Sequence, residues 1–244
     1  LVILRMSTDP KEALAEAGKA RLEKDYPRSI NLYKQAYERT KSSKKREEIL
    51  LTMVDVFIES DDWEQVMGYW GSAITENPKS AKARFGRLKY LYIVAESGNS
   101  RVWQQVQKDA SEFLEIAENE GLLNENVSQW DVLAREGDEP LDQTLGAYLR
   151  LTKARATLEL VMSGAIANKD EALVEIAADL EEVGRIEPKN VAVYFYLANA
   201  AVEKGKLLAS RGRFDERDTS AIEAKKLLED GVRAVPDDAQ SHTN

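Results

Sequence analysis

The residues that could do chemistry are few in type and scattered along the chain. There is no cysteine, which excludes disulfides, thiolate metal sites and cysteine nucleophiles together. The sole histidine, His242, lies in the C-terminal tail, where it cannot complete a catalytic triad or a usual zinc site. Neither Ala17-Gly18-Lys19 nor Lys204-Gly205-Lys206 has the glycine spacing and hydroxyl residue of a phosphate-binding loop. We therefore expect no catalytic residue, no metal and no cofactor, and a chain that is not an enzyme.

Carboxylate pairs are the remaining candidates for catalysis. Examples are Asp61-Asp62 and Glu181-Glu182, in a chain that holds 43 Asp and Glu residues, so that some adjacency is inevitable. A general acid and base need opposed environments in one cleft, which a sequence does not show. Helix caps and solvated faces explain the pairs. The triplet Asn126-Val127-Ser128 matches a glycosylation acceptor pattern, which we interpret as coincidence.

The charge of the chain is negative overall but uneven. A formal net charge of -9 argues against a duplex nucleic-acid binder, because such proteins present excess Lys and Arg to phosphates. Residues 1–46 hold 12 Lys and Arg against 6 Asp and Glu, whereas the remaining residues hold 22 against 37. A basic head on an acidic body favours head-to-tail association or contact with an anionic surface; a lopsided solvated surface is the alternative. The basic run Lys41, Lys44, Lys45 and Arg46 is likewise either a solvated turn or a binding patch.

The elements that must position any site are amphipathic helices. Counted from Trp63, apolar residues recur at offsets 3, 4, 7, 10 and 11, which is one face of an α-helix. The same register starts at Tyr26 and Trp103, and weaker copies start at Lys169 and Ala221. Each copy follows another amphipathic run. The sequence thus predicts helix hairpins that must stack on one another to bury their stripes.

These hairpins resemble the tetratricopeptide repeat (TPR) family, in a degenerate form. Residues 47–78 match the family pattern at Leu50, Phe57, Trp70 and the closing Pro78, among others. The run from Pro188 to Gly205 matches the closing proline and the next first helix. The resemblance covers roughly residues 11–119 and 142–236. It implies an all-α fold, a right-handed superhelical solenoid of about five stacked antiparallel helix pairs.

Departures from the pattern suggest how the chain is organised. We expect residues 1–10 to be a leader or cloning remnant, 11–119 to form pairs 1 to 3, and 141–236 to form pairs 4 and 5 with an insertion near 205–218. Residues 120–140 are expected to be an inserted loop with a short helix that packs through Trp130; a repeat remnant or a hinge is the alternative. Residues 237–244 look like the start of a truncated further repeat, as in part of a longer, bacterial chain.

The implied function is that of a protein–protein interaction scaffold. In the family that the chain resembles, peptides or partner helices lie in the groove lined by the first helix of each pair. Exposed aromatics there would anchor a partner, and polar groups would orient it; packing between repeats is the alternative for each aromatic. The register carried over from the family places these candidate residues in the groove: Asp55, Glu59, Phe85, Lys89, Tyr92, Phe195, Asn199 and Glu203.

Two other functions and the compartment stay open. One alternative is a structural protein that self-assembles head to tail through complementary charges. Another is an enzyme whose catalytic domain lies outside this sequence. No run approaches the roughly 18 apolar residues needed to cross a bilayer, so we expect a soluble domain, cytoplasmic or periplasmic. The apolar stub Leu1–Leu4 is either the end of a removed signal or membrane segment or a cloning remnant.

Overall fold

The computed structural model describes residues 9–134 and 141–234, and within these ranges the chain is all-α. It forms ten α-helices and two short 3-10 helices there, and its only β-type pairing is an isolated bridge between Asn126 and Thr144. The predicted leader up to residue 8, the predicted start of a further repeat and His242 lie outside the described residues. The predicted all-α fold class is confirmed.

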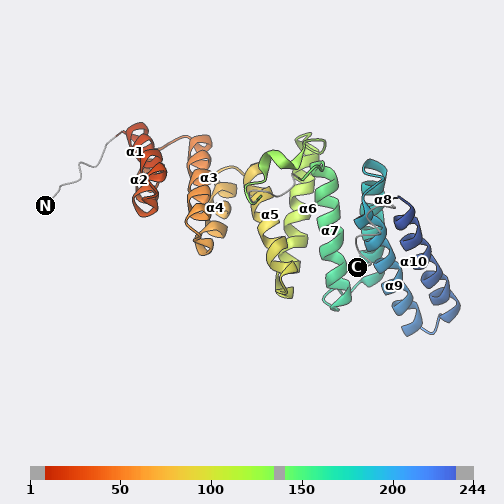
Figure 1. Ribbon diagram of the computed structural model, residues 1–244. Coiled ribbons are helices and arrows are strands. Elements are labelled where there is room, and N and C mark those ends of the chain that lie inside the picture. Colours follow the sequence, from red (N-terminus) through yellow and green to blue (C-terminus); the bar gives the residue numbers. More distant parts are fainter. Residues whose placement is uncertain (1–8, 135–140, 235–244) are drawn as a thin grey trace. The chain divides into compact units, whose positions relative to one another are not determined.

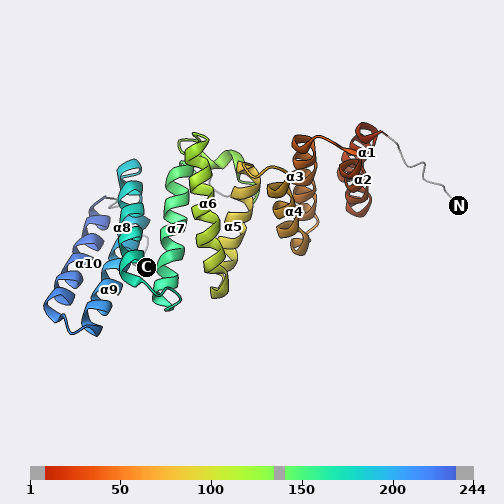
Figure 2. The same ribbon diagram turned by 180° about the vertical axis from the view of Figure 1, so that it is seen from behind.

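The helices pair in chain order (Figures 1 and 2). The pairs are α1 (Pro10–Leu22) with α2 (Tyr26–Arg39), α3 (Ser43–Glu59) with α4 (Trp63–Glu76), α5 (Ala81–Glu96) with α6 (Trp103–Asn119), α7 (Leu145–Met162) with α8 (Lys169–Ile186), and α9 (Val191–Ser210) with α10 (Phe214–Ala234). The five predicted helix pairs are therefore present among the described residues. Their superhelical path stays a prediction.

The chain divides into two compact units, and the division falls inside α5. Among the described residues, unit 1 comprises 9–87 and 130–134, and unit 2 comprises 88–129 and 141–234. Unit 1 thus contains α1 to α4 and the beginning of α5. Unit 2 contains the end of α5 and α6 to α10.

One turn geometry recurs in every pair. After each first helix comes a residue with positive φ, and the next amide donates to a carbonyl five residues earlier, as in a Schellman motif. The positive-φ residues are Lys24, Asp61, Gly98, Gly164 and Gly212. The donor–acceptor pairs are Asp25 to Ala20, Asp62 to Phe57, Asn99 to Val94, Ala165 to Leu160 and Arg213 to Leu208. The backbone repeats more faithfully than the side chains do, since glycine fills the left-handed position in only three of the five turns.

The core of unit 1 centres on Trp70 of α4, which is 1% exposed. Its indole lies against Gly86 of α5, where a methyl group added to the glycine would meet three ring atoms at 2.7 to 2.8 Å. Phe57 of α3 packs on Tyr69 with ring centroids 4.8 Å apart. Glycine at position 86 therefore permits the close approach of α5 to the indole.

Glu76 ties the first two helix pairs together. Its carboxylate accepts a hydrogen bond from the Tyr37 hydroxyl at 2.7 Å and pairs with Arg46 at 2.8 Å. The Ser43 hydroxyl donates to the Glu76 carbonyl at 2.8 Å. The Tyr37 hydrogen bond is the main reason that the pKa of Glu76 lies below its ordinary value. One side chain thus joins α2, α3 and α4.

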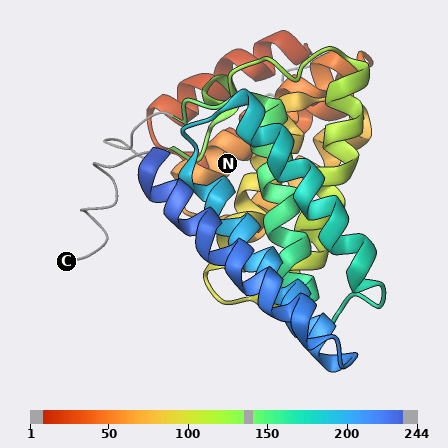
Figure 3. The ribbon, with the colours of Figure 1, turned by 90° about the vertical axis from the view of Figure 1, so that its right-hand side faces the viewer.

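The core of unit 2 surrounds α7 and α8. Ile176 and Leu180 of α8 are fully buried in a cluster with Leu158 of α7 and Val193 of α9. Helices α9 and α10 lie side by side (Figure 3) and meet through small residues. Ala198 and Ala201 of α9 form this contact with Ala224, and Gly231 approaches the Tyr194 side chain.

Two predicted insertions take definite forms. Residues 205–218 extend the last pair, because α9 continues to Ser210 and α10 begins at Phe214. The short helix expected in 120–140 is a 3-10 turn over Val127–Trp130. Val127 is fully buried in unit 2, whereas Trp130 packs on Phe85 of unit 1, with ring centroids 6.3 Å apart.

The outer faces of the first and last described helices differ in chemistry. In α9, Ala198 and Ala201 face the pair's own second helix, while Val193, Leu197 and Ala200 pack toward α8. Helix α1 can be aligned with α9 by matching its buried Ala17 and Ala20 to those two alanines. The positions of Val193, Leu197 and Ala200 are then occupied in α1 by exposed charged residues, namely Glu12, Glu16 and Lys19. In α10, by contrast, Leu228 and Val232 are 48% and 56% exposed. In the repeat register these positions correspond to Ile176 and Leu180 of α8, which are buried.

Candidate partner-binding surface

An apolar stripe runs along the exposed face of α9. Val191, Phe195 and Val202 are 37%, 51% and 43% exposed, and Asn199 and Lys206 continue the same face at helical spacing. Two other faces of α9 pack against α8 and α10. Large apolar side chains on one exposed face, rather than scattered singly, mark interaction surfaces.

Three of the residues predicted from the sequence lie on or beside this stripe. Phe195 is exposed and contacts the neighbouring Tyr196 ring edge-on, with centroids 5.5 Å apart. Asn199 and Glu203 are half-buried, and the Glu203 carboxylate pairs with Lys206 at 2.5 Å. The structure therefore brings together an exposed aromatic, an amide and an ion pair on one helix.

Beside the stripe, Arg155 of α7 is held from several sides. Its guanidinium lies over the rings of Trp103 and Tyr196, at 5.5 and 5.3 Å from their centroids. It also pairs with Glu159 at 2.7 Å and with Glu96 at 3.2 Å. Arginine stacked between rings and carboxylates is fixed in one orientation, because its planar fork satisfies several partners at once. Sequence reasoning missed Arg155; its only signal was a cation within the apolar run of α7.

The predicted residue Tyr92 belongs to the same cluster. Its ring meets Trp103 edge-on at 5.7 Å, and burial is the main cause that raises the pKa of Tyr92 far above its ordinary value. Through Trp103 and Arg155 this cluster connects Tyr92 of α5 with Tyr196 of α9 within unit 2, so the Tyr92 ring is already packed.

A second missed cation, Lys153 of α7, is half-buried against α8. Its ammonium pairs with Glu175 at 2.6 Å and with Asp179 at 2.9 Å. Burial opposes the charged form of Lys153, but the two carboxylates outweigh it and raise its pKa. Burial likewise raises the pKa of Asp179. These three side chains connect α7 to α8, so we assign them to the stability of this helix pair.

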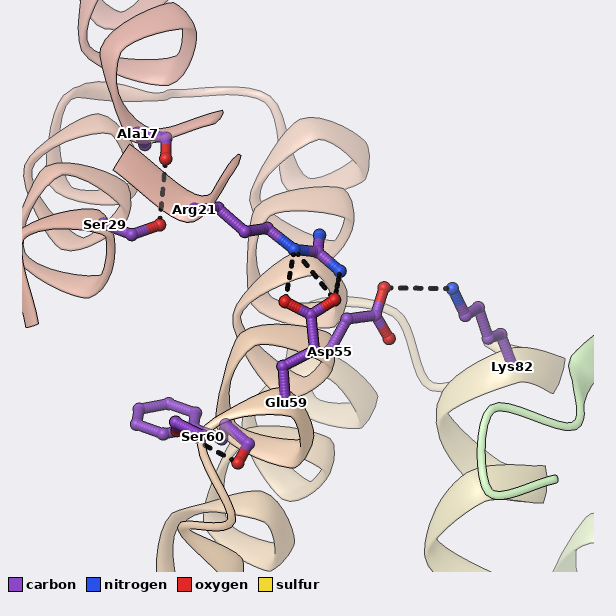
Figure 4. A network of polar contacts seen from close by, with 8 residues as sticks. Ala17, Arg21, Ser29, Asp55, Glu59, Ser60 and Lys82 are labelled. Carbon is purple, nitrogen blue, oxygen red and sulfur yellow. Dashed lines mark hydrogen bonds and ion pairs between the residues drawn. The ribbon is translucent and has the colours of Figure 1, made fainter. Parts of the chain in front are cut away.

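In unit 1 the predicted residues Asp55 and Glu59 take part in an ion-pair ladder (Figure 4). Arg21 of α1 binds both Glu59 oxygens, at distances from 2.5 to 3.2 Å, and Asp55 pairs with Lys82 of α5 at 3.8 Å. Burial raises the pKa of Asp55, while Lys82 and Arg21 act in the opposite direction. The ladder links the first helices of three successive pairs, so these carboxylates already have partners.

Phe85 is the one predicted anchor that the structure contradicts. Its side chain is fully buried beneath Trp130, so the prediction of an exposed aromatic at this position is wrong. The register carried over from the repeat gives no warning, because the covering ring comes from the segment inserted outside the repeat. The remaining predicted residue, Lys89, is half-buried on α5.

Arg155 should matter for stability in proportion to its burial. Replacing it with methionine is expected to lower the unfolding free energy by about 1–2 kcal/mol, because the change removes ring stacking and leaves two carboxylates without a cation. Urea unfolding followed by circular dichroism would measure the change. The matched control is Arg185→Met, whose ion pair with Glu182 is as short, at 2.6 Å, but more exposed; it is expected to leave the urea midpoint almost unchanged, because solvent screens an exposed ion pair. Equal losses in the two variants would contradict the role given to Arg155.

Two searches for other kinds of site give negative results over the described residues. No three His, Cys, Asp or Glu side chains gather there in a way that could hold a metal ion. In the same part of the chain, no helix combines the length and the apolar character needed to cross a membrane.

Comparison with known proteins identifies no family. No protein-family model matches the sequence, and no curated protein matches it either. A solved structure described as "MamA RS-1 ArsTM double mutant" aligns over 91% of this chain and 97% of that chain, with 11% sequence identity and a TM-score of 0.48. At this score the likeness adds nothing to the fold class, which follows from the helix pairs themselves.

Proposed function

We propose that this chain is a TPR-like scaffold that binds a partner protein or peptide and has no catalytic role of its own. The observation that carries the proposal is the apolar stripe of α9, with Val191, Phe195 and Val202 exposed on a helix that packs against α8 and α10 through two other faces. Burying this stripe would stabilise a complex, since apolar area removed from water contributes about 25 cal/mol per Å².

The chemistry of the stripe favours a partner with apolar anchors and few charges at its centre. Phe195 offers a ring that a partner side chain can cover, and beside it the Asn199 amide offers an NH2 donor group and a carbonyl acceptor. The Glu203 and Lys206 pair lies at the rim, where charges orient a partner more than they strengthen binding. Because α9 is a preformed helix fixed on two sides, the scaffold loses little conformational entropy on binding.

Self-assembly by head-to-tail stacking is the weaker candidate. Stacking a second copy on α1 would bury the charged residues Glu12, Glu16 and Lys19, at positions where α9 buries apolar ones. Burying charged side chains is unfavourable, because they lose their hydration. The exposed Leu228 and Val232 of α10 would then face charges instead of an apolar surface.

A pull-down with matched variants tests the proposal. Replacing Phe195 and Val202 by alanine together should weaken partner capture by tenfold or more, because truncating a central anchor costs roughly 2 kcal/mol or more. The control is Ile222→Ala with Val232→Ala on α10, which removes exposed apolar side chains from another helix. We expect the control to capture the same partners as wild type. An unchanged partner set in the Phe195 and Val202 variant would remove the α9 surface from the proposal.

A further inference from the structure

A cavity of about 560 Å³ lies in unit 1 where three segments meet. The beginning of α1, the end of α2 with the turn after it, and the first three turns of α3 line it. Leu14 of α1 and the buried Ile49 of α3 contribute apolar surface. The volume is large enough to hold one or two amino-acid side chains, because binding pockets start at roughly 300 Å³.

Cations predominate among the side chains that line this cavity. Lys11, Arg39, Lys41 and Lys45 face two carboxylates, those of Asp9 and Glu48. Among the described residues, no carboxylate lies within ion-pair distance of Lys11, Lys41 or Lys45. Two residues of the basic run noted in the sequence, Lys41 and Lys45, thus line a cavity.

Helix α3 starts with an electrostatic conflict at this place. Its first turn carries Lys44, Lys45 and Arg46 and no acid, although the N-terminal end of a helix is itself positive. Helices α8 and α10 begin in the opposite way, with Asp170 and Glu171 and with Asp215 and Glu216. A negatively charged ligand beside α3 would offset both the lysines and the helix dipole.

From this combination we infer that the cavity is a docking site for an acidic peptide segment that carries an apolar side chain. The apolar side chain enters between Leu14 and Ile49, and the flanking carboxylates meet Lys11, Lys41 and Lys45. The site is separate from the α9 stripe and does not depend on the function proposed for that stripe.

A fluorescein-labelled peptide with one leucine flanked by glutamates is the probe, and the same peptide with glutamines is its control. Fluorescence anisotropy with the full chain should show saturable binding of the acidic peptide, weakening as salt is added because ions screen exposed charges. The double variant Lys41→Glu with Lys45→Glu should weaken binding roughly tenfold, since each reversal replaces an attraction by a repulsion and weakens binding about threefold. The variant Leu14→Asn should also weaken it, by removing the apolar wall.

The matched control is Arg28→Glu with Lys34→Glu, which makes the same change of charge on α2 outside the cavity. We expect this control, and the Phe195→Ala with Val202→Ala variant, to bind the acidic peptide within about twofold of wild type, because distant exposed charges are screened. Equal binding of the glutamine peptide would overturn the inference. So would an equal loss in the Arg28 and Lys34 control, or full affinity in Leu14→Asn.

Discussion

Replacing Trp70 with alanine is expected to lower the unfolding free energy by about 3–5 kcal/mol, the cost of removing a large aromatic side chain from a closed core. Trp70 is 1% exposed and lies between α4 and the beginning of α5. The neighbouring helices relax only in part around the space that the indole leaves, so a cavity remains. Urea unfolding followed by circular dichroism at a helix wavelength measures the loss without relying on tryptophan emission.

The chain supplies a control of the same residue type on the same helix. Trp63 begins α4 and is 36% exposed, with its indole nitrogen donating to Asp61 at 2.5 Å. Trp63→Ala is expected to cost no more than about 1–1.5 kcal/mol, because more than a third of the residue is already in water and the helix end can close around the change. Similar losses for the two tryptophans would show that burial between α4 and α5 does not stabilise unit 1 in the way the structure indicates.

Gly86→Ala is expected to destabilise the wild-type chain and to stabilise the Trp70→Ala chain. In wild type the new methyl group would lie 2.7 to 2.8 Å from three indole atoms, and such overpacking costs about 1–3 kcal/mol. Without the indole its three nearest contacts are gone, and alanine is then favoured over glycine in a helix by about 1 kcal/mol. The four proteins form a double-mutant cycle whose coupling energy is measured by the same urea unfolding.

Gly68→Ala is the control for the helix-propensity part of this argument. Gly68 lies on the exposed side of α4, and a methyl group there meets nothing within 4 Å. The substitution should stabilise the chain by about 0.5–1 kcal/mol. If Gly86→Ala stabilises wild type as Gly68→Ala does, the close approach of α5 to Trp70 is not a feature of the folded protein.

The helix pairs could be predicted from the sequence because their signal is local. Apolar residues at helical spacing mark α4 from Trp63 onward, and Asp61 and Asp62 mark the turn before it. The recurrence of that spacing predicted stacked hairpins, even where Lys169 and Ala221 replace the leading aromatic. The Schellman geometry that ends each first helix was not predicted, because two of the five left-handed positions are occupied by Lys24 and Asp61 instead of the usual glycine.

The candidate surface was harder to predict because exposure is a tertiary property. Phe85 and Phe195 both lie on first helices, yet Phe85 is fully buried with Trp130 packed on it, whereas Phe195 is 51% exposed. Asp55 and Glu59 have the spacing of groove residues, but Arg21 and Lys82, from two other helices, neutralise them. Repeat register places a residue on a helix; it does not say which distant side chain will reach it.

The exposed face of α1 is charged and that of α10 is apolar, so the two helices differ in how readily a designed helix pair could be packed on them. A designed helix pair grafted after α10 could bury Leu228 and Val232 with little redesign of the host. A pair grafted before α1 would first require apolar replacements for Glu12, Glu16 and Lys19. Adding a helix pair after α10 should therefore require fewer substitutions in this protein than adding one before α1.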